Sequence, residues 1–220
     1  MILAFDTCMS RCSAALWSDG ALVAGRAEDM RVGHAERLVP MIAELLAETG
    51  QPGKAVEGIV VTTGPGTFTG QRVGLSVARG LMLSWGVPGV GISCFEALAA
   101  GHTASEGVFH VSFDARRGQV YWQSFSANGT DFDPLGEGEC LPIAEAQARF
   151  AARPAPVLGT AGAVLGTEDG GLLPDARIFG RLWGRYEPGP GRLVRPLYLR
   201  APDAQLPHNP PPRRGEAPGR

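Results

Sequence analysis

Apolar and polar positions along the first hundred residues follow two periodicities, one typical of strands and one typical of helices. The runs that predict strands are 2–5, 12–17, 21–26, 58–63 and 88–92. The stretches that predict helices are 34–49, 71–83 and 94–101. Asp19-Gly20 predicts a hairpin turn between the second and third strands, and Gly50 predicts the end of the first helix. A strand hairpin followed by alternating helices and strands predicts a mixed sheet with helices packed on it.

The second half of the chain begins with a pattern like that of the first half. An apolar strand over 108–113 ends at Asp114, as the strand over 2–5 ends at Asp6, and each is followed by a turn and another strand. We interpret this similarity as an internal duplication. The remaining signals predict a strand over 119–125, a helix over 143–150, a short strand over 156–158 and a last apolar segment over 196–199.

The segment Gly64-Pro65-Gly66-Thr67-Phe68-Thr69-Gly70 joins a predicted strand to a predicted helix. Bare backbone N–H groups in such a loop can face an anion. The GK[ST] ending of a Walker A loop is absent, and glycines also permit a tight turn in which two backbones approach closely. We favour the tight turn over a catalytic role. Thr67 or Thr69 is expected to cap the helix that follows.

Asp6 and Asp114 lie at the carboxyl ends of the two duplicated strands. Ligands of α/β sheets bind at that edge, where a carboxylate can hold a hydrated Mg²⁺ beside a nucleotide phosphate. An aspartate at such a place can instead cap its own turn. The spacing leaves both interpretations open.

The helix over 71–83 is apolar nearly all round, and small residues recur along it every four positions. They form two stripes, Gly70, Gly74 and Ala78, and Ser76, Gly80 and Ser84. Small residues let another backbone come close, whereas a surface helix is expected to have a polar face. This helix is therefore either buried within its own chain or packed against a partner, and we favour the partner.

Composition narrows the classes of function. The 220 residues are 44% hydrophobic, which is enough for a sizeable core, and 22 acidic against 20 basic residues give a net charge of −2. The pI of about 6.1 argues against a chain that binds nucleic acid by itself, because such proteins are usually basic. No basic leader precedes the first strand and no long apolar run follows it, so we expect a cytoplasmic protein without a membrane partner.

No convincing set of catalytic groups assembles in the sequence. The four cysteines, at positions 8, 12, 94 and 140, form no CxxC pair and are expected to be reduced, buried thiols. The four histidines show neither HxxxH nor HxxH spacing, and no GxSxG motif is present. We therefore predict no catalytic residue and no metal site.

Four motifs and a closing segment resemble one family. They are Ile2-Leu3-Ala4-Phe5-Asp6-Thr7, His34-Ala35-Glu36-Arg37-Leu38-Val39-Pro40, the glycine loop with its helix, Phe113-Asp114-Ala115-Arg116-Arg117-Gly118-Gln119-Val120-Tyr121-Trp122, and Pro196-Leu197-Tyr198-Leu199-Arg200. Together they are similar to the TsaB family, also called YeaZ, a subunit of the bacterial machinery that makes threonylcarbamoyladenosine in tRNA. The resemblance is good to about residue 125 and poor over 126–190.

The resemblance implies an α/β, two-lobed, actin-like or RNase H-like fold with mixed five-stranded sheets and a reduced second lobe. The lobes are expected at 1–103 and 104–201, and the Pro- and Arg-rich residues 202–220 are expected to be a disordered tail. The resemblance also implies a non-catalytic subunit that forms a heterodimer with the catalytic relative TsaD. The ATPase TsaE is expected to join this pair, tRNA to be met through the complex, and a homodimer to form when TsaD is absent.

The family pattern also assigns residues. In TsaD the segment after the strand that corresponds to 88–92 carries metal-binding histidines in an HxEGH-type pattern, where this chain has Cys94 and Leu98 with Glu96 between them. The helices over 34–49 and 70–84 imply a partner interface at His34, Leu38, Met41, Leu45, Arg72, Val73, Ser76, Val77 and Gly80. A vestigial nucleotide site is expected at Asp6, Thr7, Gly64, Gly66, Asp114, Arg116 and Gly159. ATP or ADP with Mg²⁺ is expected only at the level of the complex.

Two other functions remain as alternatives. One is a small actin-fold phosphotransferase or nucleotide-binding protein that uses Asp6 and Asp114 around Mg·ATP. The other is a metalloprotease, against which the missing histidines argue.

Overall fold

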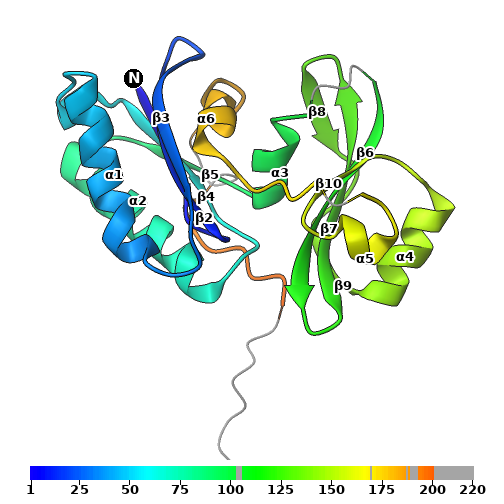
Figure 1. Cartoon of the computed structure of the whole chain (residues 1–220). Helices are drawn as coiled ribbons and strands as arrows, with labels where there is room; N and C mark the ends of the chain where they lie inside the picture. Colours follow the sequence, from blue (N-terminus) through cyan, green and yellow to red (C-terminus); the bar gives the residue numbers. More distant parts are fainter. Residues whose placement is uncertain (103–105, 169, 187, 189–192, 201–220) are drawn as a thin grey trace, which may run out of the picture.

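The computed structural model describes residues 1–102, 106–168, 170–186, 188 and 193–200. These residues form two lobes, each built on a mixed five-stranded sheet (Figure 1). The two-lobed α/β, actin-like fold that the resemblance implies is thereby confirmed. The predicted tail over 202–220 lies outside the described residues. No helix in the described part of the chain is long and apolar enough to cross a membrane.

The first sheet has the strand order β3-β2-β1-β4-β5. Its strands are β1 (Ile2–Asp6), β2 (Arg11–Ser18), β3 (Ala21–Asp29), β4 (Gly58–Thr62) and β5 (Gly89–Ile92). The first three strands are antiparallel neighbours, whereas β4 runs parallel to β1 and β5 parallel to β4. The predicted hairpin turn is present, because Asp19 and Gly20 both have positive φ angles, of 51° and 76°.

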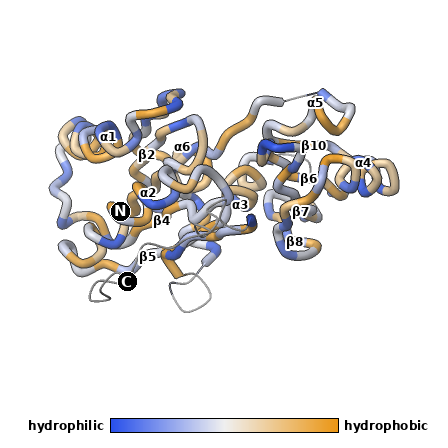
Figure 2. Tube along the Cα trace, turned by 90° about the horizontal axis from the view of Figure 1, so that it is seen from below, coloured by the Kyte–Doolittle hydropathy of each residue, from blue (hydrophilic) through white to orange (hydrophobic). Residues whose placement is uncertain are grey.

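Helices cover both faces of this sheet. Helices α1 (His34–Glu48) and α2 (Phe68–Trp85) pack on one face, on the side of the molecule away from the second lobe (Figure 1). The short α3 (Cys94–Ala99) packs on the other face, towards the second lobe, and a one-turn helix η1 (Gly53–Ala55) precedes β4. Figure 2 shows hydrophobic and hydrophilic residues alternating along α1, as the predicted helical spacing requires.

The second sheet repeats the plan of the first. Its strands are β6 (Glu106–Arg116), β7 (Gln119–Asn128), β8 (Asp131–Pro134), β9 (Glu139–Pro142) and β10 (Val157–Gly159). β6 and β7 form an antiparallel hairpin and β10 lies parallel to β6, as β4 lies parallel to β1. Gly64 and Gly159, which follow β4 and end β10, have nearly equal φ angles of 112° and 111°. Helices α4 (Ile143–Ala152) and α5 (Gly162–Leu165) complete this lobe.

The last part of the described chain returns to the first lobe. Helix α6 (Ala176–Phe179) and the one-turn helix η2 (Gly180–Gly184) pack against β1, β2 and β3. The Trp17 indole N–H donates to the carbonyl of Ala176 at 2.9 Å, and Phe179 is fully buried in the core. The predicted second lobe over 104–201 is therefore wrong for residues 175–184. Those residues were assigned by sequence order, whereas their buried contacts are with the first sheet.

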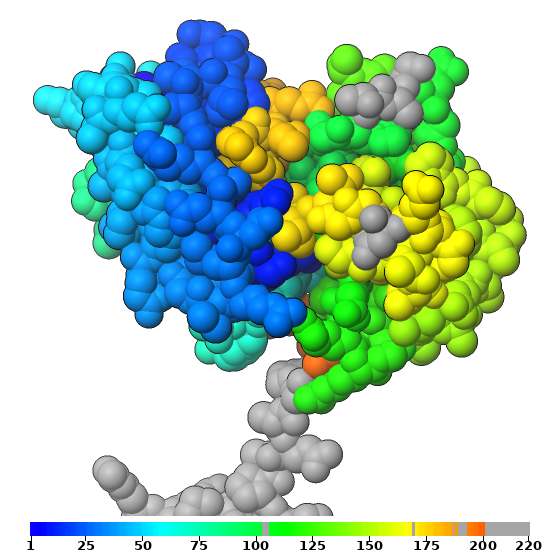
Figure 3. All heavy atoms as spheres, viewed as in Figure 1, coloured from blue at the N-terminus to red at the C-terminus, as the bar shows by residue number. Residues whose placement is uncertain are grey.

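One hydrophobic core runs through both lobes. It contains Val60 and Phe95 of the first lobe together with Phe113 and Phe125 of the second. The rings of Phe95 and Phe113 lie 5.7 Å apart across the boundary. Because this core is shared, the lobes are expected to stay packed together along the line where they meet in Figure 3.

Candidate functional site

A cleft of about 940 Å³ opens between the two lobes. Its lining comes from the β1–β2 turn, the glycine loop, the start of α2, the β6–β7 hairpin and the last described segment. The residues that line it are Met9, Ser10, Arg31, Gly66, Thr67, Phe68, Gln71, Phe113, Asp114, Ala115, Arg116, Arg117, Tyr121, Thr160, Leu173, Leu197, Tyr198, Leu199 and Arg200. Three of the seven predicted nucleotide-site residues, Gly66, Asp114 and Arg116, are among them.

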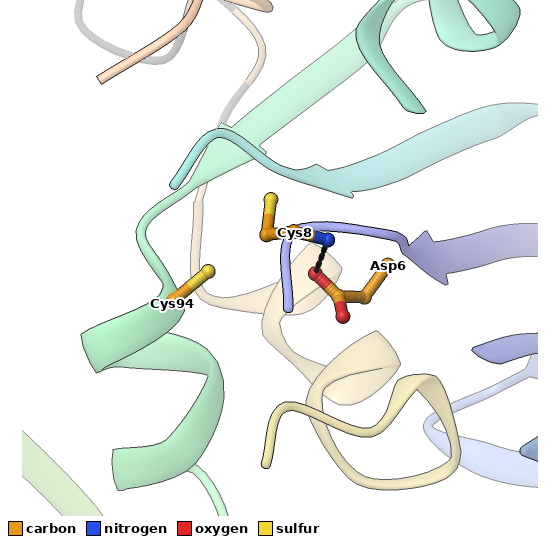
Figure 4. Close-up of side chains that lie close together, drawn as sticks. All are labelled: Asp6, Cys8 and Cys94. Atoms are coloured by element: carbon orange, nitrogen blue, oxygen red, sulfur yellow. Dashed lines mark hydrogen bonds between the residues drawn. The ribbon is translucent and has the colours of Figure 1, made fainter. Parts of the chain in front are cut away.

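Asp6 lies beneath the cleft instead of facing it. Its side chain is fully buried, and one carboxylate oxygen accepts the Cys8 N–H at 3.1 Å (Figure 4) and the Thr62 hydroxyl. The other oxygen, Oδ2, has no hydrogen-bond partner. Burial raises the pKa of Asp6 to about 6, against the lowering effect of the Thr62 and Cys8 hydrogen bonds. The bond to Cys8, two residues on, is the turn-capping geometry, so the capping interpretation describes Asp6.

The glycine loop packs directly onto the chain that leaves β1. A Cβ atom added to Gly66 would lie 2.2 Å from the Cys8 carbonyl oxygen, and one added to Gly70 would lie 2.1 Å from the Thr7 carbonyl oxygen. The Thr67 N–H donates to Cys8 at 2.7 Å, and the buried Thr7 hydroxyl donates to Gly70 at 2.7 Å. These contacts confirm the tight turn, because only glycine permits such close approach.

Thr67 caps α2, as predicted. Its side-chain oxygen accepts the N–H of Gly70 at 3.1 Å, which satisfies one of the free donors of the first turn. Gly64 is also engaged in contacts within the protein. Its carbonyl accepts the Cys94 N–H at 2.7 Å, and the Gln71 side chain fills the space beside its Cα. The loop donors and carbonyls named here are thus engaged within the protein.

Asp114 in the second lobe has the same capping role as Asp6 but is exposed. Its Oδ1 accepts the Arg116 N–H at 2.7 Å, and its own N–H donates to the Thr160 hydroxyl at 3.2 Å. Gly159 packs on the other side, where an added Cβ would lie 2.2 Å from the Ser112 carbonyl oxygen. The duplicated aspartates are therefore equivalent in the turn that they form and different in their access to solvent.

Cys94, Glu96 and Leu98 each have a structural role, in core packing or in helix capping. Cys94 and Leu98 are buried in the shared core, and Glu96 forms a capping box with Ser93 at the start of α3. Possible metal-ligand atoms of Asp6, Cys8 and Cys94 lie within 4.8 Å of one another (Figure 4). Burial raises the pKa of both thiols, which opposes the thiolate form that a metal needs.

The predicted interface residues of α1 need correction. Leu38, Met41 and Leu45 are completely buried against the first sheet, and His34 is 8% exposed with its Nε2 2.9 Å from the Met9 carbonyl oxygen. These side chains are core residues, so the prediction that they contact a partner is wrong. The apolar stripe at helical spacing was the stripe that faces the protein's own sheet.

The two small-residue stripes of α2 lie on different sides of the helix. Gly70, Gly74 and Ala78 are buried, and Gly74 lies under the Thr7 hydroxyl. On the outer side, Ser76 and Gly80 are exposed, and an added Cβ at Gly80 would meet nothing within 4 Å. Burial within the chain thus describes the first stripe, whereas packing of the second stripe against a partner stays a prediction.

The exposed side of α1 and α2 forms a surface that we call the two-helix face. Its members are small or apolar, exposed or half-buried residues on the outer sides of the two helices. They are Ala35, Val39, Ala43, Val73, Ser76, Val77 and Gly80. Val39 is 53% exposed. The charged flank of α1 lies elsewhere, because Arg37 binds Glu28 of β3 at 2.6 Å and Glu44 at 2.8 Å.

Arg72 belongs to a different cluster from the rest of the predicted interface. Its guanidinium carbon lies 3.6 Å from the centre of the Phe68 ring, and its Nε donates to the Tyr198 hydroxyl at 3.1 Å. Phe68 and Tyr198 stack with ring centres 5.6 Å apart. Sequence reasoning missed Phe68, Tyr198 and Arg31 as cleft residues. The first two lie in motifs that it singled out, but no local pattern indicates that these motifs meet.

The chain is similar to proteins named for tRNA modification. The family model described as TsaD, tRNA N6-adenosine threonylcarbamoyltransferase, matches residues 28–155, which is more than half of the chain. The tRNA threonylcarbamoyladenosine biosynthesis protein TsaB of Escherichia coli (strain K12) is 36% identical over 126 residues, 56% of this chain and 54% of the relative. The TsaB of Bacillus subtilis (strain 168) is 35% identical over 120 residues, 54% of this chain and 52% of the relative. The chain thus spans about half the length of these two relatives.

A solved structure matches over a longer span. The YeaZ protein of Pseudomonas aeruginosa has a TM-score of 0.75 and 30% sequence identity, and the match covers 90% of this chain and 99% of that one. Sequence and fold agree on the family, and the protein is therefore a member of the TsaB/YeaZ family.

Proposed function

We propose that this protein is a non-catalytic subunit of the machinery that makes threonylcarbamoyladenosine in tRNA, and that it acts by forming a heterodimer with TsaD through the two-helix face. The observation that carries the proposal is this face. It offers exposed Val39 on α1 and open space over Gly80 on α2, and the other sides of both helices are already packed. The names of the TsaB relatives support the pathway.

Close packing explains why this face suits a partner built on helices. Gly80 and Ser76 have almost no side chain, so a helix of TsaD can approach the backbone of α2 closely. Val39, Val73 and Val77 supply apolar area, and fully burying one valine side chain is worth about 1.5–3 kcal/mol. A single charge placed there is expected to be costly, because it would be buried without a counter-ion.

The surroundings of the Asp6 carboxylate favour a supporting role over catalysis. Asp6 is buried beneath the glycine loop, where it caps a turn. The loop itself is filled by the backbone of residues 7 and 8. A phosphotransferase would need this carboxylate near Mg·ATP, whereas Asp6 is buried. We therefore assign ATP with Mg²⁺ to the complex with TsaD and the ATPase TsaE.

The test is reconstituted modification of tRNA with TsaD, TsaE and the enzyme that makes threonylcarbamoyl adenylate. Val39→Glu is expected to abolish the stimulation that this chain gives. The matched control is Val164→Glu, because Val164 is also an exposed valine, 37% exposed, but lies on α5 in the second lobe. Asp6→Asn is expected to keep full activity. Loss of activity in Asp6→Asn with normal folding would instead support the phosphotransferase alternative.

A further inference from the structure

The cleft between the lobes is lined by positive charge, although the chain as a whole carries a net charge of −2. Four arginines, Arg31, Arg116, Arg117 and Arg200, are among the described residues that line it, against the single carboxylate of Asp114. They come from three separate parts of the chain, the segment before α1, the β6–β7 hairpin and the last described segment. Such a local excess attracts anions even when the net charge does not.

Two of these arginines lie in a backbone conformation that arginine disfavours. Arg116 and Arg117 have φ angles of 62° and 56°, at the tip of the β6–β7 hairpin. Turns with positive φ ordinarily take Asn or Gly, and other residues cost of order 1 kcal/mol there. Both arginines of this turn line the cleft.

Two aromatic side chains, Phe68 and Tyr198, line the same cleft as the arginines and form what we call the aromatic platform. Phe68 and Tyr198 stack on each other, while Arg72 covers the Phe68 ring. Phe68 remains 54% exposed and Tyr198 45% exposed. Exposed aromatic rings beside arginines are the arrangement by which proteins stack unpaired bases and hold the backbone between them.

The structure of the loop argues against a mononucleotide held by its triphosphate in this cleft. The Thr67 N–H is engaged by the Cys8 carbonyl, and Gly66 lies against the same carbonyl. Asp6 is buried and its carboxylate already accepts two hydrogen bonds. The arginines line an open cleft and do not form a closed phosphate-binding loop. This arrangement suits several phosphates along a nucleic-acid chain better than one triphosphate.

We infer that the interlobe cleft binds single-stranded RNA directly, with the Phe68–Tyr198 platform stacking an unpaired base and Arg31 and Arg116 contacting backbone phosphates. The inference rests on the proposed function, in which the substrate is a tRNA with an unpaired anticodon loop. It adds that this subunit contributes to holding the substrate, and it assigns the contact to a surface other than the two-helix face.

The experiment measures binding of a fluorescent RNA hairpin with an unpaired loop to the full chain by anisotropy, over a series of salt concentrations. Phe68→Ala is expected to weaken binding of the hairpin about tenfold and to leave a fully paired RNA duplex unaffected. The double variant Arg31→Ala, Arg116→Ala is expected to reduce the slope of log affinity against log salt by about 1–2, since each lost phosphate contact removes somewhat less than one unit. Arg153→Ala is the matched control, because Arg153 is an exposed arginine at the end of α4 outside the cleft.

Several results would overturn the inference. These are no hairpin binding by the wild type, an unchanged affinity in Phe68→Ala, or an equal loss in Arg153→Ala. Binding of Mg·ATP that displaces the hairpin and is weakened by Phe68→Ala would make the cleft a mononucleotide site. Circular dichroism and the unfolding midpoint establish that the variants fold.

The same variants are tested for pairing with TsaD by gel filtration. Pairing is expected to persist because the three substituted cleft residues lie outside the two-helix face. If TsaD does not pair even with the wild type while RNA binding still depends on Phe68, the proposed function fails and the RNA site stands. If pairing is normal while RNA binding is indifferent to Phe68, the RNA site fails and the proposed function stands.

Discussion

From the buried carboxylate of Asp6 we predict how the free energy of unfolding depends on pH. Burial raises its pKa from 3.8 to about 6 in the folded protein. Because the folded state holds the proton more tightly than the unfolded state, the stabilisation is complete below about pH 4 and is lost as the pH rises through about 6. A difference of about two pKa units corresponds to about 3 kcal/mol.

Asp6→Asn isolates this contribution. The amide oxygen can still accept from Cys8 and Thr62, while the oxygen that lacks a partner is replaced by an uncharged NH₂ group. We expect similar free energies of unfolding for the two proteins near pH 4.5. Near pH 7.5 the variant is expected to be more stable by about 2–3 kcal/mol.

Urea unfolding followed by circular dichroism at both pH values measures the two differences. Asp114→Asn is the matched control, because it removes the carboxylate that forms the equivalent turn but is exposed to solvent. This control is expected to keep the pH dependence of the wild type. If the stability of Asp6→Asn relative to the wild type is the same at both pH values, the reasoning about Asp6 is wrong.

Further predictions concern the glycine loop, its cap and the thiols. Gly70→Ala is expected to lower the free energy of unfolding in urea by more than about 2 kcal/mol, because the new Cβ would clash with the Thr7 carbonyl oxygen. Gly80→Ala, on the open side of the helix, is expected to raise that free energy by up to about 1 kcal/mol. Equal effects of the two substitutions would refute this packing. Thr67→Ala is expected to cost about 1 kcal/mol through the lost cap, and an unchanged midpoint would contradict that role. In a thiol titration of the native protein only Cys140, the one partly exposed cysteine, is expected to react promptly, and fast reaction of further thiols would show that the core opens.

Much of the first lobe was predictable because its elements are long and strongly periodic. The spacing of Leu38, Ile42 and Leu45 predicted α1, and the dipeptide Asp19-Gly20 predicted the hairpin. The strands β8 and β9 were missed, because each has four residues and includes proline, which is atypical of strands. Helix α6 has only four residues and is held by distant contacts such as that of Trp17, which no local pattern encodes.

The site was less predictable than the fold for a physical reason. An apolar stripe at helical spacing predicts that one side of a helix is buried, but it does not say whether the protein or a partner buries it. For α1 the stripe faces the sheet, and Val39 on the outer side is the exposed residue. The cleft combines Arg31, Phe68 and Tyr198 from distant parts of the chain, so it exists only in the folded protein.

The central claim is that the two-helix face pairs with TsaD. The most direct measurement is the molar mass by light scattering after gel filtration of this chain mixed with TsaD of the same organism. We predict a one-to-one complex that Val39→Glu or Gly80→Glu abolishes and Val164→Glu preserves. A complex that survives Val39→Glu and Gly80→Glu, or no complex with the wild type, would contradict the claim.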